Sequence, residues 1–317
     1  MQDAFGRNIT YLRLSVTELC NLRCRYCMPP EGIQKRLHED MLTQEETLLA
    51  VKVAAKLGIS KVRITGGEPL VKKNILALCQ GVADTEGIEE LCLTTNGTLL
   101  PGLADSLLAA GVRRINISLD TLNPDTYARI TRVGKLSDAL SGLHAALAAG
   151  FEKVKINAVL MGGVNDGEIG SLAELSRAYP VDVRFIELMP MPGSQAFKEA
   201  AFVPGEAVLK ALPELMPLPQ EDGVASLYTL PGAKGRVGLI RPLSCQFCGT
   251  CDRLRLTADG RIKPCLHQPL EYPIKGLSEQ QMQAQFRRAI QNKPPWHGEL
   301  SSQSPSRAGR PMHRIGG

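Results

Sequence analysis

The segment CNLRCRYC places Cys20, Cys24 and Cys27 within eight residues, directly after a run that predicts a strand. A structural zinc ion usually takes four protein ligands, and an iron–sulfur cluster of four irons usually takes four thiolates. Three thiolates would leave one iron of such a cluster open to bind a small molecule. A fourth ligand from elsewhere in the chain would instead complete a zinc site, so the residues alone leave both interpretations open.

A second group of three cysteines lies far along the chain and consists of Cys248, Cys251 and Cys265. Either Cys245 or His267 could complete a zinc site with them. In the run CDRLRLTADGRIKPC, Arg253 and Arg255 alternate with leucines, so both arginines project to the same side just after two of the thiols. Arginines beside a zinc ion would be structural, whereas arginines beside a cluster with an open iron would form a substrate site.

Six strand-like runs alternate with helical patterns in the first part of the chain. The runs are residues 9–16, 61–65, 91–95, 113–119, 153–160 and 181–188. Thr43 to Glu46 forms a predicted capping box, and a helical pattern at 137–149 ends at Gly150. Six βα units in succession predict parallel strands in a twisted sheet or a partial barrel.

The chain changes character after about residue 190, where proline and glycine become frequent. This second region contains the second cysteine group, a predicted strand pair within 253–265, a predicted helix at 278–290 and a polar tail. The tail, SSQSPSRAGRPMHRIGG, cannot bury enough apolar surface to fold alone. We therefore predict two domains, residues 1–190 and 191–317.

Polar side chains occupy the strands and their carboxyl ends where a plain core would be apolar. They are Arg13, Arg63, Thr94, Asn116, Ser118, Asp120, Lys155, Asn157 and Arg184. Basic side chains inside a barrel are unfavourable unless an anion meets them, and arginine binds phosphate groups through paired hydrogen bonds. The pattern predicts a cavity for a polyanion such as triphosphate. The paired glycines of TGGEP, 65–69, would let the backbone approach a ligand closely.

Composition indicates the cellular compartment and argues against nucleic acid and membranes as partners. The chain has 37 basic and 32 acidic residues, a mild net charge of +5 that does not indicate a nucleic-acid-binding protein. No apolar run approaches the roughly 18 residues of a membrane span, and the start, MQDAFGRN, lacks the apolar core of a signal peptide. We expect a cytoplasmic protein, in which nine clustered cysteines favour metal binding over disulfides. Cys79 and Cys92, which stand apart, are interpreted as small buried apolar residues.

The spacing C-x3-C-x2-C of the first group resembles the cluster-binding loop of the radical S-adenosylmethionine superfamily. Longer motifs resemble the GTP 3′,8-cyclase family of that superfamily, in the same order along almost the whole chain. These motifs are GRNITYLRLSVTELCNLRCRYCMP, VRITGGEPL, TTNG, RINISLDTL, VKINAVLMGGVND, RFIELMP, GTCDRLRLTADGRIKPCL and the terminal Gly316-Gly317.

The resemblance implies an α/β fold, a partial (β/α)6 barrel of the TIM type with a smaller C-terminal α+β domain that carries a second iron–sulfur cluster. It also implies the first step of molybdenum-cofactor biosynthesis. In that step a 5′-deoxyadenosyl radical from S-adenosylmethionine removes the C3′ hydrogen of GTP, and the C3′ radical adds to C8. The adduct is still a radical, and a reduction step then gives the product, (8S)-3′,8-cyclo-7,8-dihydroguanosine 5′-triphosphate.

Carried over by motif, the resemblance assigns a role to individual residues. Ligands of the first 4Fe–4S cluster are Cys20, Cys24 and Cys27, and ligands of the second are Cys248, Cys251 and Cys265. Residues of the S-adenosylmethionine site are Tyr26, Gly67, Ser118 and Met189. Residues that contact GTP are Arg13, Arg63, Thr94, Lys155, Arg253, Leu254 and Arg255. Residues implied in catalysis are Arg184, Gly316 and Gly317, the last two at the end of a tail that enters the active site.

Two departures from the family pattern are Asp252, where asparagine is usual, and Glu18-Leu19, where Asp-Arg is frequent. Cys245 is an extra thiol that we expect to stay free, because a fourth thiolate on the second cluster would block the guanine base. The implied partners are an electron donor such as flavodoxin or ferredoxin and a downstream cyclic pyranopterin monophosphate synthase. The expected state is a monomer or homodimer.

Two other functions remain possible on the residues alone. One is a radical enzyme that modifies a peptide or another small molecule. The other is a non-catalytic iron–sulfur or zinc protein, for which TGGEP and the basic strand residues would have no purpose.

Overall fold

The computed structural model describes residues 1–34, 36–192, 194, 202–221, 223–301 and 303–316. The first six strands are β1 (Tyr11–Ser15), β2 (Lys61–Thr65), β3 (Glu90–Thr95), β4 (Arg114–Ser118), β5 (Lys153–Leu160) and β6 (Val181–Glu187). The later strands are β7 (Met216–Pro217), β8 (Ser226–Thr229), β9 (Val237–Ile240), β10 (Arg253–Leu256), β11 (Arg261–Lys263) and β12 (Tyr272–Pro273). The helices are α1 (Gln44–Lys56), α2 (Ile75–Ala83), α3 (Ala104–Ala109), α4 (Pro124–Thr131), α5 (Leu136–Ala149), α6 (Ile169–Ala178), α7 (Glu206–Ala211) and α8 (Glu279–Gln291).

One curved sheet runs through the molecule in the order β12-β11-β10-β1-β2-β3-β4-β5-β6-β9-β8-β7. Strands β1 to β6 pair in parallel, as the six βα units predicted, and β10 and β9 extend the parallel part on its two sides. The antiparallel strands lie at the two ends of the sheet. The partial barrel is confirmed, and strands from the second region of the chain complete both of its flanks.

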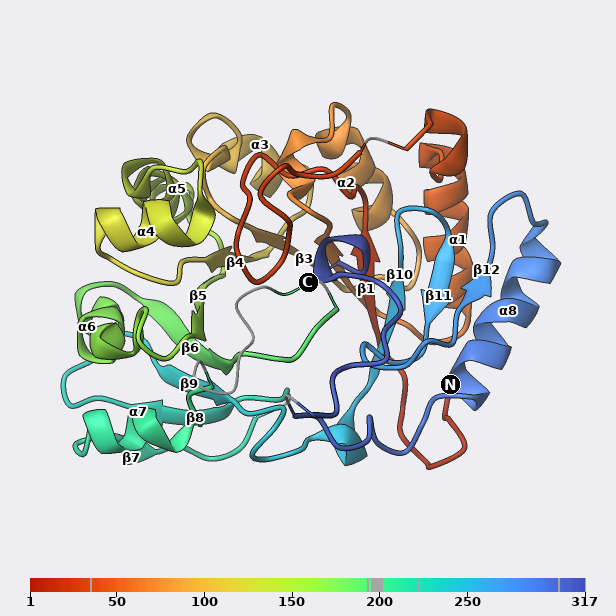
Figure 1. Cartoon of the computed structure of the whole chain (residues 1–317). Helices are drawn as coiled ribbons and strands as arrows, with labels where there is room; N and C mark the ends of the chain where they lie inside the picture. Colours follow the sequence, from red (N-terminus) through yellow and green to blue (C-terminus); the bar gives the residue numbers. More distant parts are fainter. Residues whose placement is uncertain (35, 193, 195–201, 222, 302, 317) are drawn as a thin grey trace.

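Alternation along the strands separates an apolar outer face from a polar inner face. In β5 the buried Val154, Ile156 and Ala158 alternate with the half-buried Lys155 and Asn157. Helices α1 to α6 surround the sheet on its outer side, and α8 packs beside α1 (Figure 1). The helices therefore cover the apolar face, and the polar side chains are left to face the interior.

The helices begin and end at the capping residues that the sequence predicted. Thr43 and Glu46 form a complete capping box at α1, and Gly150 ends α5 with a left-handed φ of 80°. Ser278 caps α8, so the helix predicted at 278–290 is confirmed within one residue at each end. The strand pair predicted within 253–265 is the β10–β11 hairpin. Among the described helices none is long and apolar enough to cross a membrane.

The polar tail folds back onto the barrel instead of extending into solvent. Ser306, Ala308, His313 and Ile315 are all buried, and the C-terminal segment runs to the middle of the ring of strands (Figure 1). Ala308 and Ile315 pack with Met191 of the segment after β6. Residue Gly317 lies outside the described residues.

Gly142 of α5 provides a test of how tightly this helix packs against the sheet. A Cβ at this position would collide with the carbonyl oxygen of Gly97, in the turn after β3. We expect Gly142→Ala to lower the free energy of unfolding by about 1–3 kcal/mol, the usual effect of overpacking. A lower melting temperature in thermal unfolding followed by circular dichroism would show this.

Gly170→Ala in α6 is the matched control, because a Cβ there meets no described atom within 4 Å. Alanine also favours a helix over glycine by up to about 1 kcal/mol. The melting temperature of this variant should therefore equal or exceed that of the wild type. Equal melting temperatures for both variants would contradict the packing of α5 on the turn.

Candidate active site

A single cavity of about 660 Å³ is lined by both cysteine groups. Cys20, Cys24 and Cys27, the first trio, lie on the loop after β1. The second trio, Cys248, Cys251 and Cys265, comes from the loops around β10 and β11. Between them the cavity is lined by the inner faces of strands β1 to β6 and β10. Two segments more than two hundred residues apart in the chain therefore share one enclosed space.

The pairing of β10 with β1 explains where each trio lies. Because these strands are parallel, the first trio follows the carboxyl end of β1, whereas Cys251 precedes the amino end of β10. Cys265 follows β11, which is antiparallel to β10, and so returns to the same edge as Cys251. A strand rises about 3.3 Å per residue, so the two trios lie beyond opposite ends of a strand about 16 Å long. A small molecule of nucleotide size fits between them.

Three arginines form a row across three neighbouring strands. Arg13 of β1 is in register with Arg255 of β10 on one side and with Arg63 of β2 on the other. Like charges directly opposite one another destabilise a sheet. Burial lowers the pKa of Arg13 well below its usual value, and the neighbouring Arg255 lowers it further. Burial and the nearby Arg253 likewise lower the pKa of Arg255 to about 10.

A second set of polar groups lines the wall formed by β3 to β6. Burial, with repulsion from Arg63 as the next cause, lowers the pKa of Arg184 to about 10. Four buried side-chain atoms on this wall have no hydrogen-bond partner among the described residues, namely Thr94 Oγ1, Asn116 Oδ1, Asn157 Oδ1 and Arg184 Nε. Buried polar atoms are normally hydrogen-bonded. Polar atoms without partners, next to several cations, are therefore what we expect of a site that binds a polyanion.

The first trio and TGGEP form one packed unit at the other end of the cavity. Burial raises the pKa of Cys20 to about 11 and that of Cys27 to about 12, so the thiols hold their protons until a metal displaces them. Gly67 N donates to the Thr17 carbonyl oxygen over 2.8 Å, and a Cβ at Gly67 would collide with the Leu19 carbonyl. Gly67 is thus required for packing against the cysteine loop, in addition to the ligand contact that the resemblance implies.

The other residues implied at the S-adenosylmethionine site also line the cavity. Tyr26, Gly67, Ser118 and Met189 are all among its lining residues. The Tyr26 hydroxyl donates to Asp120 over 2.8 Å, which orients the ring of this residue from the cysteine loop. This end of the cavity therefore combines three thiols with aromatic, hydroxyl and thioether groups, a donor set suited to an iron–sulfur cluster and a small cofactor.

The second trio has a buried cation beside it. Lys293 is only 3% exposed, and its ammonium group donates to the carbonyl oxygens of Arg253 and Pro264, both over 2.8 Å. Burial would raise the pKa of Cys251, but the charges of Lys293 and Arg253 outweigh it and hold the pKa below its usual value. A nearby cation favours the thiolate form, so Cys251 fits a metal ligand with an anionic sulfur, whereas burial raises the pKa of Cys248 and Cys265.

The two residues considered as a fourth zinc ligand lie in different surroundings. Cys245 is exposed and is not among the residues that line the cavity. His267 lines the cavity, but its Nδ1 lies 3.0 Å from Ser306 Oγ. Within the described part of the chain, no three His, Cys, Asp or Glu side chains converge where one metal ion could be held. The fit of a cluster at either trio rests on the chemistry of the sulfur donors.

All but one of the residues predicted to contact the anion line the cavity. Arg13, Arg63, Thr94, Lys155, Arg184, Arg253 and Arg255 line the cavity. Leu254 does not: its side chain is fully buried in the apolar core on the opposite face of β10, so only its backbone could reach a ligand. Asp252 lies 3.7 Å from Arg253 Nε and so reduces the positive charge at that end.

Tyr11 and Lys293 are among the lining residues that were not recognised in the sequence. Tyr11 accepts a hydrogen bond from Arg63 Nε, and its position two residues before Arg13 could have revealed its inward direction. Lys293 gave no such signal, because its partners are backbone carbonyls of distant segments. Gly316 lies next to the cavity, where its carbonyl oxygen accepts a hydrogen bond from Arg255 over 2.6 Å.

Comparisons with known proteins agree with this site. Residues 14–176 match the family model described as the radical SAM superfamily, and residues 181–299 match Molybdenum Cofactor Synthesis C. The chain is 46% identical to the GTP 3′,8-cyclase of Alkaliphilus oremlandii and 47% identical to that of Moorella thermoacetica, with the full length of each chain covered. The chain belongs to the GTP 3′,8-cyclase family. This confirms the predicted radical SAM enzyme with S-adenosylmethionine and iron–sulfur clusters as cofactors, and it argues against a non-catalytic zinc protein.

Solved structures confirm the fold at lower sequence identity. Streptococcus suis SuiB bound to S-adenosylmethionine has a TM-score of 0.61 at 17% identity, covering 82% of this chain and 61% of SuiB. This chain therefore spans about three fifths of SuiB's length. Methylornithine synthase has a TM-score of 0.53 at 18% identity, covering 66% of this chain and 63% of the synthase. Both similarities support the assignment of this GTP 3′,8-cyclase family member to the radical SAM barrel fold.

Lys155 gives the site a predicted pH dependence. Burial, with repulsion from Arg184 as the next cause, lowers the pKa of Lys155 to about 7. A bound polyanion would raise this pKa, so affinity is highest below pH 7 and falls above it, by up to about tenfold per pH unit. Isothermal titration calorimetry with tripolyphosphate, in buffers of different ionisation enthalpy, should show proton uptake at pH 7.5.

Lys155→Met provides the control for protons that tripolyphosphate itself takes up. Its binding should be weaker and should lose the part of the proton uptake that belongs to the ammonium group. The same proton uptake in the variant and the wild type would show that Lys155 does not face the bound anion.

Proposed function

We propose that this protein is a GTP 3′,8-cyclase that converts GTP to (8S)-3′,8-cyclo-7,8-dihydroguanosine 5′-triphosphate, the first step of molybdenum-cofactor biosynthesis. The observation that carries the proposal is the shared cavity, in which both trios face a common space. Its cationic lining includes Arg13, Arg63, Lys155, Arg184, Arg253 and Arg255. An enzyme that joins a ribose carbon to the base of one nucleotide must hold both ends of that nucleotide. The cavity offers a binding group for each end.

Each trio would serve one end of the cavity: the first the cofactor, and the second the guanine base. Cys20, Cys24 and Cys27 would hold the cluster that binds S-adenosylmethionine, and Cys248, Cys251 and Cys265 would hold the cluster that faces the guanine. When bound, the reduced first cluster and S-adenosylmethionine supply a 5′-deoxyadenosyl radical, which takes the C3′ hydrogen of GTP. Everything else required of the protein is binding, orientation and exclusion of water.

The cations orient GTP through its triphosphate. The row Arg255–Arg13–Arg63 offers guanidinium groups at the spacing of neighbouring strands, and Lys155 offers an ammonium group from the opposite wall. Guanidinium groups bind phosphate oxygens in pairs and so fix an angle as well as a position. Held this way, the ribose and base have little freedom to turn, which keeps C3′ and C8 close to each other.

Burial supplies the second requirement, protection of a carbon radical. The tail covers the cavity on one side, and Gly316 has a left-handed φ of 81° at a place where a Cβ would collide with Thr65 Oγ1. Glycine is therefore the residue that this position accepts. We assign Gly316 the role of bringing a backbone carbonyl to Arg255 during the reaction, with Arg184 contributing charge from β6.

The partners follow from the chemistry. The first cluster needs an electron from a donor of low potential, for which a flavodoxin or ferredoxin is suited. The cyclised nucleotide would pass to a cyclic pyranopterin monophosphate synthase. A cytoplasmic monomer or homodimer is consistent with these roles.

The function is tested by anaerobic incubation of the reconstituted protein with GTP, S-adenosylmethionine and dithionite. We expect 5′-deoxyadenosine and the cyclised nucleotide in equal amounts by liquid chromatography and mass spectrometry. Two clusters would give about eight irons per chain. Cys24→Ala should lower the iron to about four and abolish both products, because one ligand of the first cluster is lost.

Cys245→Ala is the matched cysteine control. Cys245 is exposed and outside the cavity, so iron content and both products should match those of the wild type. Loss of about four irons from Cys245→Ala would mean that this thiol is a ligand. The second cluster would then have no open iron for guanine, and the proposal would fail.

A further inference from the structure

Residues 306–316, the C-terminal tail, contact two parts of the cavity wall. Arg255 donates to the Gly316 carbonyl oxygen over 2.6 Å, and His313 Nδ1 lies 3.0 Å from the Cys27 carbonyl oxygen. The Ser306 amide donates to the Pro190 carbonyl oxygen over 2.9 Å. The tail thus touches the arginine row and the first trio at once, although few of its residues are apolar.

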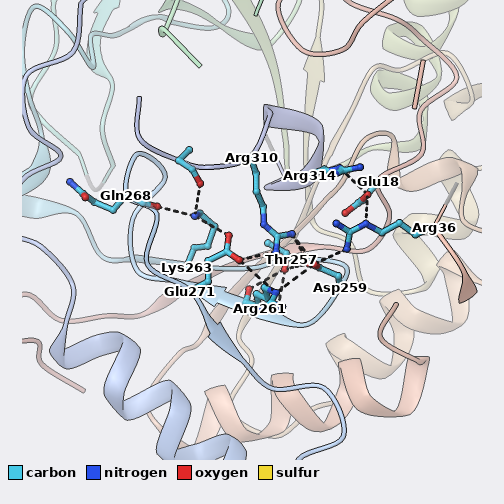
Figure 2. A network of polar contacts seen from close by, with 11 residues as sticks. Glu18, Arg36, Thr257, Asp259, Arg261, Lys263, Gln268, Glu271, Arg310 and Arg314 are labelled. Atoms are coloured by element: carbon cyan, nitrogen blue, oxygen red, sulfur yellow. Dashed lines mark hydrogen bonds and ion pairs between the residues drawn. The ribbon is translucent and has the colours of Figure 1, made fainter. Parts of the chain in front are cut away.

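Arg310 binds two carboxylates of the barrel at once (Figure 2). Its Nη1 donates to the two carboxylate oxygens of Asp259 over 2.9 and 2.8 Å, and its Nη2 donates to Glu271 Oε2 over 2.8 Å. The three side chains are 13%, 6% and 14% exposed, so solvent screens these ion pairs only in part. Paired hydrogen bonds between guanidinium and carboxylate groups are among the strongest in proteins. Arg310, Asp259 and Glu271 are named the clamp.

The two carboxylates of the clamp are themselves held in place. Thr257 Oγ1 donates to Asp259 Oδ1 over 2.6 Å. The fully buried Lys263 donates to Glu271 Oε1 over 3.2 Å and to the Ala308 carbonyl oxygen over 3.1 Å. Asp259 lies in the turn of the β10–β11 hairpin, and Glu271 directly precedes β12. The clamp is therefore built on the same hairpin that carries Arg255.

The loop after the first trio joins the same network. Arg36 donates to Asp259 Oδ2 over 2.9 Å and lies 3.6 Å from Glu18 Oε2. Arg314 of the tail lies 3.3 Å from that same Glu18 oxygen. Glu18 lies two residues before Cys20. The tail and the cysteine loop therefore share two buried carboxylates, as Figure 2 shows.

We propose that Arg310 is a positioning residue for the reaction, because the clamp fixes the tail so that the Gly316 carbonyl lies against Arg255. This inference rests on the proposed function, which gives the tail its role in turnover. Arg310 does not line the cavity and acts through Gly316, six residues further along a chain with little apolar surface of its own. Without the clamp, the tail loses its ion pairs with Asp259 and Glu271, the contacts that hold its middle part to the barrel.

Arg307 is a matched control within the same tail. Arg307 is exposed, and it takes part in none of the ion pairs found among the described residues. Arg307→Ala and Arg310→Ala remove the same charge from the same segment, and only the second removes the clamp. Arg310→Lys keeps the charge but cannot bind both carboxylates through a planar fork.

The experiment combines hydrogen exchange with steady-state kinetics on the anaerobically reconstituted full-length protein. In Arg310→Ala, amide exchange across 306–316 should be at least about tenfold faster than in Arg307→Ala, with rates in β1 to β6 unchanged. The kcat for the cyclised nucleotide should fall about tenfold or more, while the KM for GTP changes less than threefold because the cavity cations remain. Arg310→Lys should lie between Arg310→Ala and the wild type in both measurements.

Each contrary result has its own meaning. Equal exchange in Arg310→Ala and Arg307→Ala would overturn the clamp, whatever products the wild type makes. Faster exchange with an unchanged kcat would overturn the positioning role. A wild-type protein that makes no cyclised nucleotide would contradict the proposed function, and the positioning role with it.

Discussion

The parallel pairing of β10 with β1 is the constraint on which the rest of the structure depends. It brings together segments about 240 residues apart, sets Arg255 beside Arg13, and places one cysteine trio at each end of the paired strands. Buried cations secure the join: Arg7 donates to the Cys248 carbonyl over 2.7 Å, and Lys293 donates to carbonyls on either side of the β10–β11 hairpin. A shift of this register by one residue would turn the arginines of β10 into the apolar core.

The same pairing creates an electrostatic problem that a ligand must solve. Two unit charges about 5 Å apart repel by about 3 kcal/mol at the effective dielectric constant of about 20 that suits protein sites. The row Arg255–Arg13–Arg63 contains two such neighbouring pairs, and Lys155 and Arg184 face the same space. Burial first, and repulsion from neighbouring cations second, lower the pKa values of Arg13, Lys155, Arg184 and Arg255. A triphosphate would turn mutual repulsion into specific binding, and the site is thereby selective for a highly charged substrate.

Much of the fold could be predicted from the sequence because its signals are local. Strand alternation identified the inward side chains Arg13, Arg63, Lys155 and Arg184, and helix caps such as Thr43 fixed the starts of helices. The position of β10 could not be predicted, because pairing between distant strands leaves no local pattern. The resemblance to a family supplied the roles of the cysteines, which spacing alone left open between zinc and iron.

The tail shows the limit of composition as a guide. Its polar sequence indicated a segment unable to fold alone, yet the tail forms ion pairs with Asp259 of the β10–β11 turn and with Glu271, directly before β12. Leu254 shows the opposite limit, since a motif placed it among the ligands while its side chain belongs to the core. Motifs identify positions, and only the fold shows which face of a strand each position occupies.

The central claim is that one cavity holds the S-adenosylmethionine end and the nucleotide within reach of each other. Deuterium transfer from GTP labelled at C3′ measures this most directly. If the account is correct, the 5′-deoxyadenosine released during turnover carries one deuterium from GTP. Unlabelled 5′-deoxyadenosine formed alongside the cyclised nucleotide would show that the radical does not meet C3′ in this cavity, and would contradict the account.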